Sequence, residues 1–169
     1  MRTNGFPAIA GPGARVLILG TLPSQASLQK GEYYGQPRNA FWRIMGELFG
    51  VSPELPYDER RHRVVASRVA LWDVCAAAHR PGSLDAAIDA ASVRANDLAG
   101  FLDAHRAVSL VCFNGSKAEA LYRRLVLPGA GVRAVRYETL PSTSPAHAAM
   151  PYAEKLRRWS IVRSECEGS

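Results

Sequence analysis

Small polar residues gather at four places in the chain, each directly after a short apolar run. The first stretch covers 20–39 and the second covers 73–83. The other two are 114–117, with the sequence NGSK, and 140–147, with the sequence LPSTSPAH. In open α/β sheets, ligands bind beyond the carboxyl ends of the strands. The four stretches are therefore predicted to be loops that build one site.

The first loop offers aromatic rings and an amide. Tyr33 and Tyr34 precede a Gly and a Pro, and a ring exposed there would stack on a nucleobase for about 1–3 kcal/mol. The alternative is that both rings cover the edge of the core. Asn39 directly precedes an apolar helical pattern, so its side chain is a natural helix cap. A cap that also faces a cleft is compatible with a role in chemistry.

The second and third loops each carry a candidate binding group. Asp73 follows a buried strand, where a carboxylate is costly unless it is hydrogen-bonded, and it would accept a ring N–H from a ligand. A helix cap or a salt bridge to Arg80 is the alternative. Asn114 begins a strand–glycine–helix turn whose backbone N–H groups would bind an anion, with Lys117 adding a charge. A plain strand-to-helix turn is the alternative there.

The fourth loop is rich in hydroxyl groups. Ser142, Thr143 and Ser144 are followed by Pro145, which stiffens a loop that would bind phosphate through hydroxyl and backbone donors. His147 would add a proton donor or a phosphate contact, or it is an inert surface residue. Spacing alone establishes no Ser-His-Asp triad, because triads are recognised by geometry.

Alternating strand and helix patterns place these loops on a scaffold. Apolar runs predict strands at 15–20, 69–72, 108–113 and 132–137. Helical patterns cover 41–49, 58–68, 97–105 with Asn96 as its cap, 116–126 and 152–163. This order predicts an α/β fold, a three-layer αβα sandwich around a central four-stranded, mainly parallel sheet. We expect one domain over 1–169, with 1–13 as an N-terminal extension and 164–169 as a frayed tail.

Charge and composition narrow the function. The 169 residues hold 21 Lys plus Arg and 15 Asp plus Glu, a net charge of +6, which suits a polyanionic partner, nucleic acid first. No apolar run approaches the roughly 20 residues of a membrane helix, and no signal peptide is recognisable. We therefore expect no membrane partner and a cytoplasmic location, associated with the nucleoid in a bacterium.

The three cysteines exclude some cofactors. Cys75, Cys112 and Cys166 cannot fill a four-thiolate iron–sulfur site, and their spacing contains no zinc pattern. Cys75 and Cys112 lie in apolar runs and are expected to be small core residues. We predict neither a metal nor a cofactor.

Three segments in this order resemble the uracil-DNA glycosylase superfamily, and its hypoxanthine-DNA glycosylase branch most closely. They are 20–24 (GTLPS), the run from the two tyrosines to 37–42 (PRNAFW), and 142–147 (STSPAH). The resemblance covers about 15–159. It implies the family's fold and an enzyme, a monomer, that hydrolyses the bond between a deaminated base and its sugar in DNA. Hypoxanthine is the first substrate expected, with uracil or xanthine as further ones.

The resemblance also implies roles for single residues. Leu22 stands where the family commonly has a water-activating Asp or Asn and cannot polarise water, whereas the similar branch assigns catalysis to the position of Asn39. Tyr34 falls where relatives place a ring that stacks on the flipped base. Asp73 falls where uracil-specific relatives use an Asn. Small Ala146 replaces the wedge Leu of the fourth loop, where Ser142 and Thr143 replace His and Pro.

Together these assignments give a working site. Asn39 would position water rather than deprotonate it, because an amide is no strong base, and N–H groups near 22–24 would meet the base anion. The predicted substrate-binding residues are Leu22, Pro23, Ser24, Tyr34, Asp73 and Asn114. The predicted DNA-binding residues are Ser116, Lys117, Ser142, Ser144, Pro145 and His147, with Met150 as a candidate wedge.

Two other functions remain open at this point. A noncatalytic module of the same fold would bind damaged DNA but release no free base. A flavodoxin-like binder would use the 114–117 turn for a small ligand, and would carry a nucleotide or flavin without salt-dependent DNA binding.

Overall fold

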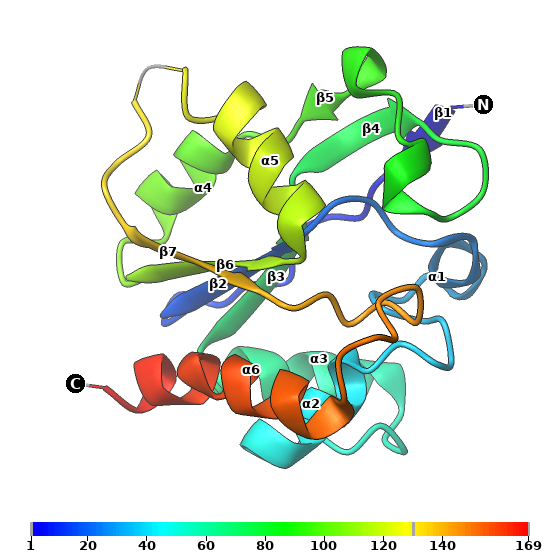
Figure 1. The fold of residues 1–169 in the computed structure, drawn as a ribbon. Helices are drawn as coiled ribbons and strands as arrows, with labels where there is room; N and C mark the ends of the chain where they lie inside the picture. The colour runs from blue at the N-terminus through cyan, green and yellow to red at the C-terminus, as the bar shows by residue number, and fades with distance from the viewer. Residues whose placement is uncertain (1, 130, 169) are drawn as a thin grey trace.

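A four-stranded parallel sheet forms the centre of the molecule (Figure 1). The computed structural model describes residues 2–129 and 131–168. The strands lie in the order β3-β2-β6-β7, with bounds Val69–Asp73, Val16–Gly20, Leu110–Asn114 and Arg136–Leu140. Every residue of β2 and β6 is buried, as expected for inner strands covered on both faces. The predicted sandwich and its sheet are confirmed.

Helices cover both faces of this sheet (Figure 1). One face carries α2 (Phe41–Phe49), α3 (Tyr57–Ala66) and α6 (Tyr152–Glu167); the other carries α4 (Leu98–Ala104) and α5 (Ser116–Leu125). Helix α2 buries Phe41, Ile44, Met45 and Leu48, a spacing that gives one apolar face. It ends at Gly50, which adopts the left-handed conformation (φ 72°) that favours glycine.

A second, antiparallel sheet packs beside the first. Its strands are β1 (Arg2–Asn4), β4 (Cys75–His79) and β5 (Arg94–Ala95), in the order β1-β4-β5. Two short 3₁₀ helices, η1 (Asp85–Ala87) and η2 (Ala90–Ser92), lie between β4 and β5. The sequence analysis placed none of these strands, because they are too short or too polar to produce a period-2 pattern.

Both ends of the chain differ from expectation. The segment 1–13 was expected to be an extension, but β1 pairs with β4 and Ile9 bridges Leu71. The tail 164–169 was expected to fray, but α6 continues to Glu167 because Cys166 is buried against the core. Residues 1 and 169 of these two segments lie outside the described part.

Three further boundaries are corrected. Strand β7 covers Arg136–Leu140 rather than 132–137. Helix α4 is capped by Asp97, whose carboxylate accepts the Gly100 N–H at 3.0 Å, and not by Asn96. A helix missed by the sequence analysis, α1 (Gln25–Lys30), occupies part of the expected 20–39 loop.

Other expectations about the core hold. Cys75 and Cys112 are fully buried, as predicted. Within the described ranges, no helix combines the length and the hydropathy needed to cross a bilayer.

Candidate functional site

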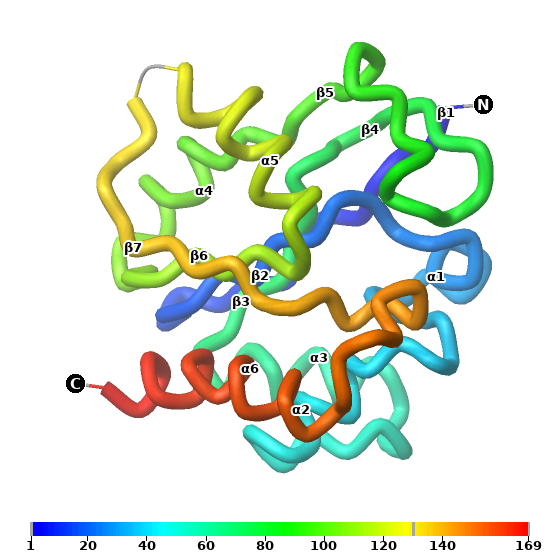
Figure 2. The backbone as a smooth tube through the Cα atoms, viewed as in Figure 1, coloured from blue at the N-terminus to red at the C-terminus, as the bar shows by residue number. Residues whose placement is uncertain are grey.

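The predicted loops meet at one edge of the parallel sheet. Gly20 is the register partner of Asp73, and Asn114 is that of Leu140, so all four strands end together. The tube in Figure 2 shows the segments after β2 and β7 running beyond this edge. Ser24 and Ser144, from the first and fourth loops, line one shared pocket, which confirms that these loops converge.

Three hollows lie around this edge. The loop groove, of about 490 Å³, lies between the second, third and fourth loops. The entrance pocket, of about 370 Å³, contains Ser24, Asn39, Leu84 and Ser144 among its lining residues. The flank pocket, of about 520 Å³, contains Tyr34, Asn39, Arg38 and Arg60.

Tyr34 and Asp73 approach one another over a glycine. A Cβ added to Gly20 would lie 2.7 Å from Asp73 Oδ1 and 3.2 Å from Tyr34 Oη. Tyr34 Oη and Asp73 Oδ2 are both buried, and neither has a hydrogen-bond partner within the described chain. Buried polar groups are normally paired, so these two oxygens remain available to a polar ligand, although Asp73, unlike Tyr34, lines none of the three hollows.

Burial controls the charge of Asp73. The residue is 4 % exposed, and burial raises the pKa of its carboxyl to about 7, with Asp85 adding to the rise and Arg80 opposing it. Neither alternative role of Asp73 is present in the described chain: it caps no helix and forms no ion pair with Arg80. Asn96 fixes its backbone, donating from Nδ2 to the Asp73 carbonyl at 2.7 Å.

Tyr34 has an unusual backbone and a partly covered ring. Its φ of 55° lies in the left-handed region, which costs a non-glycine residue on the order of 1–3 kcal/mol. The ring stacks on Phe41 with centroids 4.0 Å apart, so a base can stack only on the opposite face. Burial and the nearby Asp73 raise the pKa of the Tyr34 hydroxyl, while Asn114 opposes the shift.

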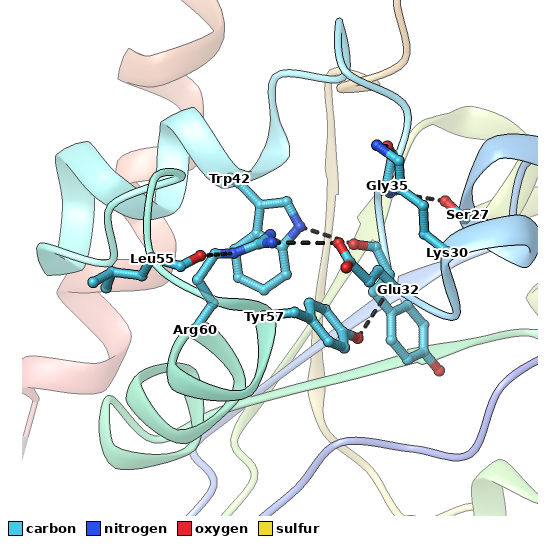
Figure 3. A network of polar contacts seen from close by, with 9 residues as sticks. Ser27, Lys30, Glu32, Gly35, Trp42, Leu55, Tyr57 and Arg60 are labelled. Carbon is cyan, nitrogen blue, oxygen red and sulfur yellow. Dashed lines mark hydrogen bonds and ion pairs between the residues drawn. The ribbon is translucent and has the colours of Figure 1, made fainter.

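Hydrogen bonds to both neighbours of Tyr34 hold it in this conformation (Figure 3). On one side, the Tyr33 carbonyl accepts from Trp42 Nε1 at 2.8 Å and its N–H donates to Tyr57 Oη at 3.0 Å. On the other side, Gly35 accepts from Lys30 Nζ at 2.7 Å and donates to Ser27 Oγ at 2.8 Å. Backbone strain persists where the surroundings over-determine it.

Tyr33 has a different role from Tyr34. It is 3 % exposed and its hydroxyl donates to the Pro7 carbonyl at 2.9 Å. Tyr33 therefore covers the core, the alternative considered for both tyrosines.

The N-cap of α2 is Ala40 and not Asn39 as expected, but the Asn39 side chain still accepts from the start of the helix and also borders a cleft. Its Oδ1 accepts the Phe41 N–H at 2.9 Å, at the first turn of α2. The residue is half-buried and lines both the entrance pocket and the flank pocket. A side chain that satisfies a helix terminus and still borders two hollows is fixed in direction, which a water-positioning group requires.

The 22–24 segment contributes backbone more than side chains. Leu22 is 8 % exposed and packs in the core beneath α4 and α5, so its side chain lines none of the three hollows. Pro23 accepts from Arg80 Nη2 at 2.5 Å, and Ser24 Oγ caps α1. The N–H groups of Leu22 and Ser24 donate to no acceptor among the described residues.

Asn114 holds the fourth loop rather than facing a hollow. Its Nδ2 donates to Thr143 Oγ1 at 2.9 Å and its Oδ1 accepts the Thr143 N–H at 2.9 Å. Both residues are buried. These bonds indicate a positioning role, whereas the sequence analysis expected Asn114 to bind substrate.

Replacing Asn114 by Ala should therefore destabilise the protein. The change leaves two buried polar groups of Thr143 without partners, so we expect a loss of about 1–3 kcal/mol. Urea unfolding followed by circular dichroism measures it. Ser116→Ala, at an exposed position, is the matched control and should change stability by less than about 0.5 kcal/mol. Equal stability of the two variants would contradict the positioning role.

The predicted DNA-binding residues lie close together. Five of them line the loop groove: Ser116, Lys117, Ser142, Ser144 and His147. Pro145 lines the adjoining entrance pocket, and Met150 lies on the groove wall. The groove thus combines a helix N-terminus, hydroxyl groups and a cation, which are the groups that contact phosphates in DNA complexes.

Comparison with known proteins identifies the family. The model described as the uracil DNA glycosylase superfamily matches residues 7–163. The chain belongs to the uracil DNA glycosylase superfamily. Its members are DNA glycosylases, and the resemblance found in the sequence motifs is confirmed.

Similar proteins agree with this superfamily. A hypoxanthine DNA glycosylase of Methanosarcina acetivorans is 38 % identical over 150 residues, 87 % of this chain and 89 % of the relative. One of Methanosarcina barkeri is 34 % identical over 119 residues, 70 % and 74 % of the two chains. A solution NMR structure of a candidate uracil DNA glycosylase from M. acetivorans has a TM-score of 0.81 at 35 % identity, covering 99 % of this chain and all of that one.

The sequence analysis did not identify some residues of this site. Asp85 and Asn96 approach Asp73 only because β4 and η1 fold back along the 20–24 segment. Arg80 was considered only as an ion-pair partner, and it instead ties the first and second loops through Pro23 and Gly82. The sequence offered no local signal for these contacts, because Arg80 and Asp85 are the only charged residues of 80–85 and lie five positions apart.

Proposed function

We propose that the protein is a monofunctional DNA glycosylase, acting as a monomer, that removes a flipped, deaminated base, hypoxanthine first, and leaves an abasic site. The observation that carries the proposal is that Tyr34 and Asp73 meet over Gly20 and that each has a buried oxygen, Tyr34 Oη and Asp73 Oδ2, without a hydrogen-bond partner among the described residues. The relatives named hypoxanthine DNA glycosylase support the choice of base. No step of the proposed reaction requires a metal or cofactor.

The mechanism assigns one task to each group. The base leaves the stack because its reacting bond is inaccessible inside a duplex. It then stacks on the face of Tyr34 opposite Phe41, and Asp73 binds its N–H edge. Asn39 positions the attacking water.

Bond cleavage gives an oxocarbenium-like sugar and a base anion. The N–H groups of Leu22 and Ser24 are free to donate to that anion. Lys117 and the hydroxyl groups of the loop groove hold the flanking phosphates, which supply mostly sequence-independent affinity.

The test is an assay for base removal. Duplexes carrying a single inosine, uracil or xanthine are incubated with the protein, and alkali-labile abasic sites are measured. Release of hypoxanthine is the expected result. Binding of the lesion duplex without base release would overturn the proposal and favour a noncatalytic damaged-DNA-binding module of the same fold.

The phosphate role of Lys117 has its own prediction. Lys117→Ala should weaken binding to all duplexes alike and reduce the slope of log affinity against log salt by about 1. Fluorescence anisotropy at several salt concentrations measures both. Arg106→Ala is the control, because Arg106 lies with Ser109 and Arg136 at the opposite end of the sheet. A slope that changes equally in both variants would remove Lys117 from the DNA contact.

A further inference from the structure

A second carboxylate stands behind Asp73. Asp85, at the start of η1, accepts a hydrogen bond from Thr21 Oγ1 at 2.6 Å. Thr21 is 5 % exposed and directly follows Gly20, the residue over which Asp73 and Tyr34 meet. Thr21 therefore fixes Asp85 against the end of β2, on the same strand end that borders Asp73.

One cation, Arg80, lies near the two carboxylates, but its hydrogen bonds go to backbone carbonyls. Arg80 is 2 % exposed; its Nη2 donates to the Pro23 carbonyl and its Nε to the Gly82 carbonyl. Its Nη1 is buried without a partner, as is Asp73 Oδ2. Arg80 forms no ion pair with either carboxylate within the described residues. The buried carboxylate of Asp73 and the half-buried carboxylate of Asp85, which also lines the loop groove, share one nearby guanidinium and leave an excess negative charge.

The other titratable groups around Asp73 carry no charge near neutral pH. Tyr33 and Tyr34 face it from the segment between α1 and α2, and burial raises both hydroxyl pKa values. Cys75, from β4, has its thiol pKa raised to about 12 by burial. The end of strand β2 and the residue after it, Gly20 and Thr21, carry no titratable group. The charge balance is therefore set by Asp73, Asp85 and Arg80.

We propose that Asp85, held by Thr21, adds to the effect of burial and keeps Asp73 in its neutral acid form, so that Asp73 reads both groups of the lactam edge of a deaminated base. The inference rests on the proposed glycosylase function and names the residue that sets its base reading. Asp85 is a positioning residue here, since it acts through Asp73.

A neutral carboxyl group matches the lactam edge in full. Its carbonyl oxygen accepts the ring N–H, and its O–H donates to the adjacent base carbonyl, whereas an ionised carboxylate only accepts. Hypoxanthine, xanthine and uracil all present this N–H/C=O pair.

The acid form also agrees with the surroundings of the side chain. A buried Oδ2 without a donor disfavours a carboxylate, and a like charge nearby disfavours it further. The pKa of about 7 follows from these two causes in the same order.

The experiment measures the pH profile of hypoxanthine release in single turnovers at saturating enzyme, from about pH 5 to about pH 9. In the wild type, release should fall as pH rises through about 7. Asp85→Asn keeps an oxygen that accepts from Thr21 Oγ1 but removes the charge. The part of its pH profile in which the release rate falls (the falling limb) should therefore move to lower pH by about one unit. Asp73→Asn, which is a donor and acceptor at every pH, should lose the falling limb.

Two controls separate the possible outcomes. His147→Gln removes the imidazole that lines the loop groove and should leave the limb in place. A carbon-13 NMR titration of the Asp73 carboxyl in the wild-type protein tests its charge even if a variant fails to fold.

The inference is overturned if Asp85→Asn titrates like the wild type, if Asp73→Asn keeps the limb, or if Asp73 ionises well below neutral pH. If the wild type releases hypoxanthine at the same rate at every pH, this inference is refuted and the proposed function stands. No release of any base at any pH would refute the proposed function instead.

Discussion

Replacing Asn39 by Ala is expected to slow base release by roughly 10² or more while DNA binding stays nearly unchanged. Asn39 lines the entrance pocket and, together with Tyr34, the flank pocket, and it carries no charge for phosphate binding. Its proposed task is to place water, so its loss removes a positioned reactant. Single-turnover cleavage of an inosine duplex measures the rate, and anisotropy measures binding.

The capping bond of Asn39 requires a matched control. Because Oδ1 accepts the Phe41 N–H, Asn39→Ala should also cost about 0.5–2 kcal/mol of stability. Asn39→Ser keeps a side-chain oxygen that can accept the Phe41 N–H but removes the amide, so it should retain stability and still lose base release. Undiminished release in the Ser variant would reassign Asn39 to capping alone.

Gly20→Ala is expected to reduce base release on the order of 10²-fold, since a misplacement of about 1 Å at a site can cost that much. The added Cβ would lie 2.7 Å from Asp73 Oδ1 and 3.2 Å from Tyr34 Oη. Both side chains would have to move, and the oxygen pair proposed to bind the base would separate. The rate constant and the apparent affinity for inosine DNA are measured together.

Gly13→Ala is the control for this change. An added Cβ there meets no atom within 4 Å, and the residue shows no left-handed backbone. We expect a folded variant with wild-type release. If Gly20→Ala releases hypoxanthine as fast as Gly13→Ala, the arrangement of Tyr34 and Asp73 around Gly20 is not part of the base site.

The parts of the fold that were predictable have strong local signals. Strand β2 is a continuous apolar run, and α2 combines a 3.6-residue period with a terminal glycine. The β1, β4 and β5 strands have weak signals because Arg2–Asn4 is polar and Arg94–Ala95 has two residues. Their pairing is decided by tertiary contacts, which no local pattern reports.

The candidate site likewise has one part that the sequence predicted and another that it could not predict. Convergence of the loops followed from the parallel sheet, and the resemblance pointed to Tyr34, Asn39 and Asp73. The partner of a polar side chain could not be predicted: Asn114 binds Thr143, and Asp85 binds Thr21 across 64 positions of sequence. Such pairs depend on how β4 and the fourth loop fold back, and this is a property of the three-dimensional structure alone.

The outer strands of the parallel sheet bear on aggregation. Open edges invite pairing with other chains. At β3, Ile9 occupies the edge through two hydrogen bonds with Leu71 of 2.9 Å each. At β7, exposed Arg136 and Glu138 place charges along the strand. The N-terminal segment therefore also protects β3 against intermolecular strand addition. Removing it would expose the strand edge at Leu71, two residues before Asp73.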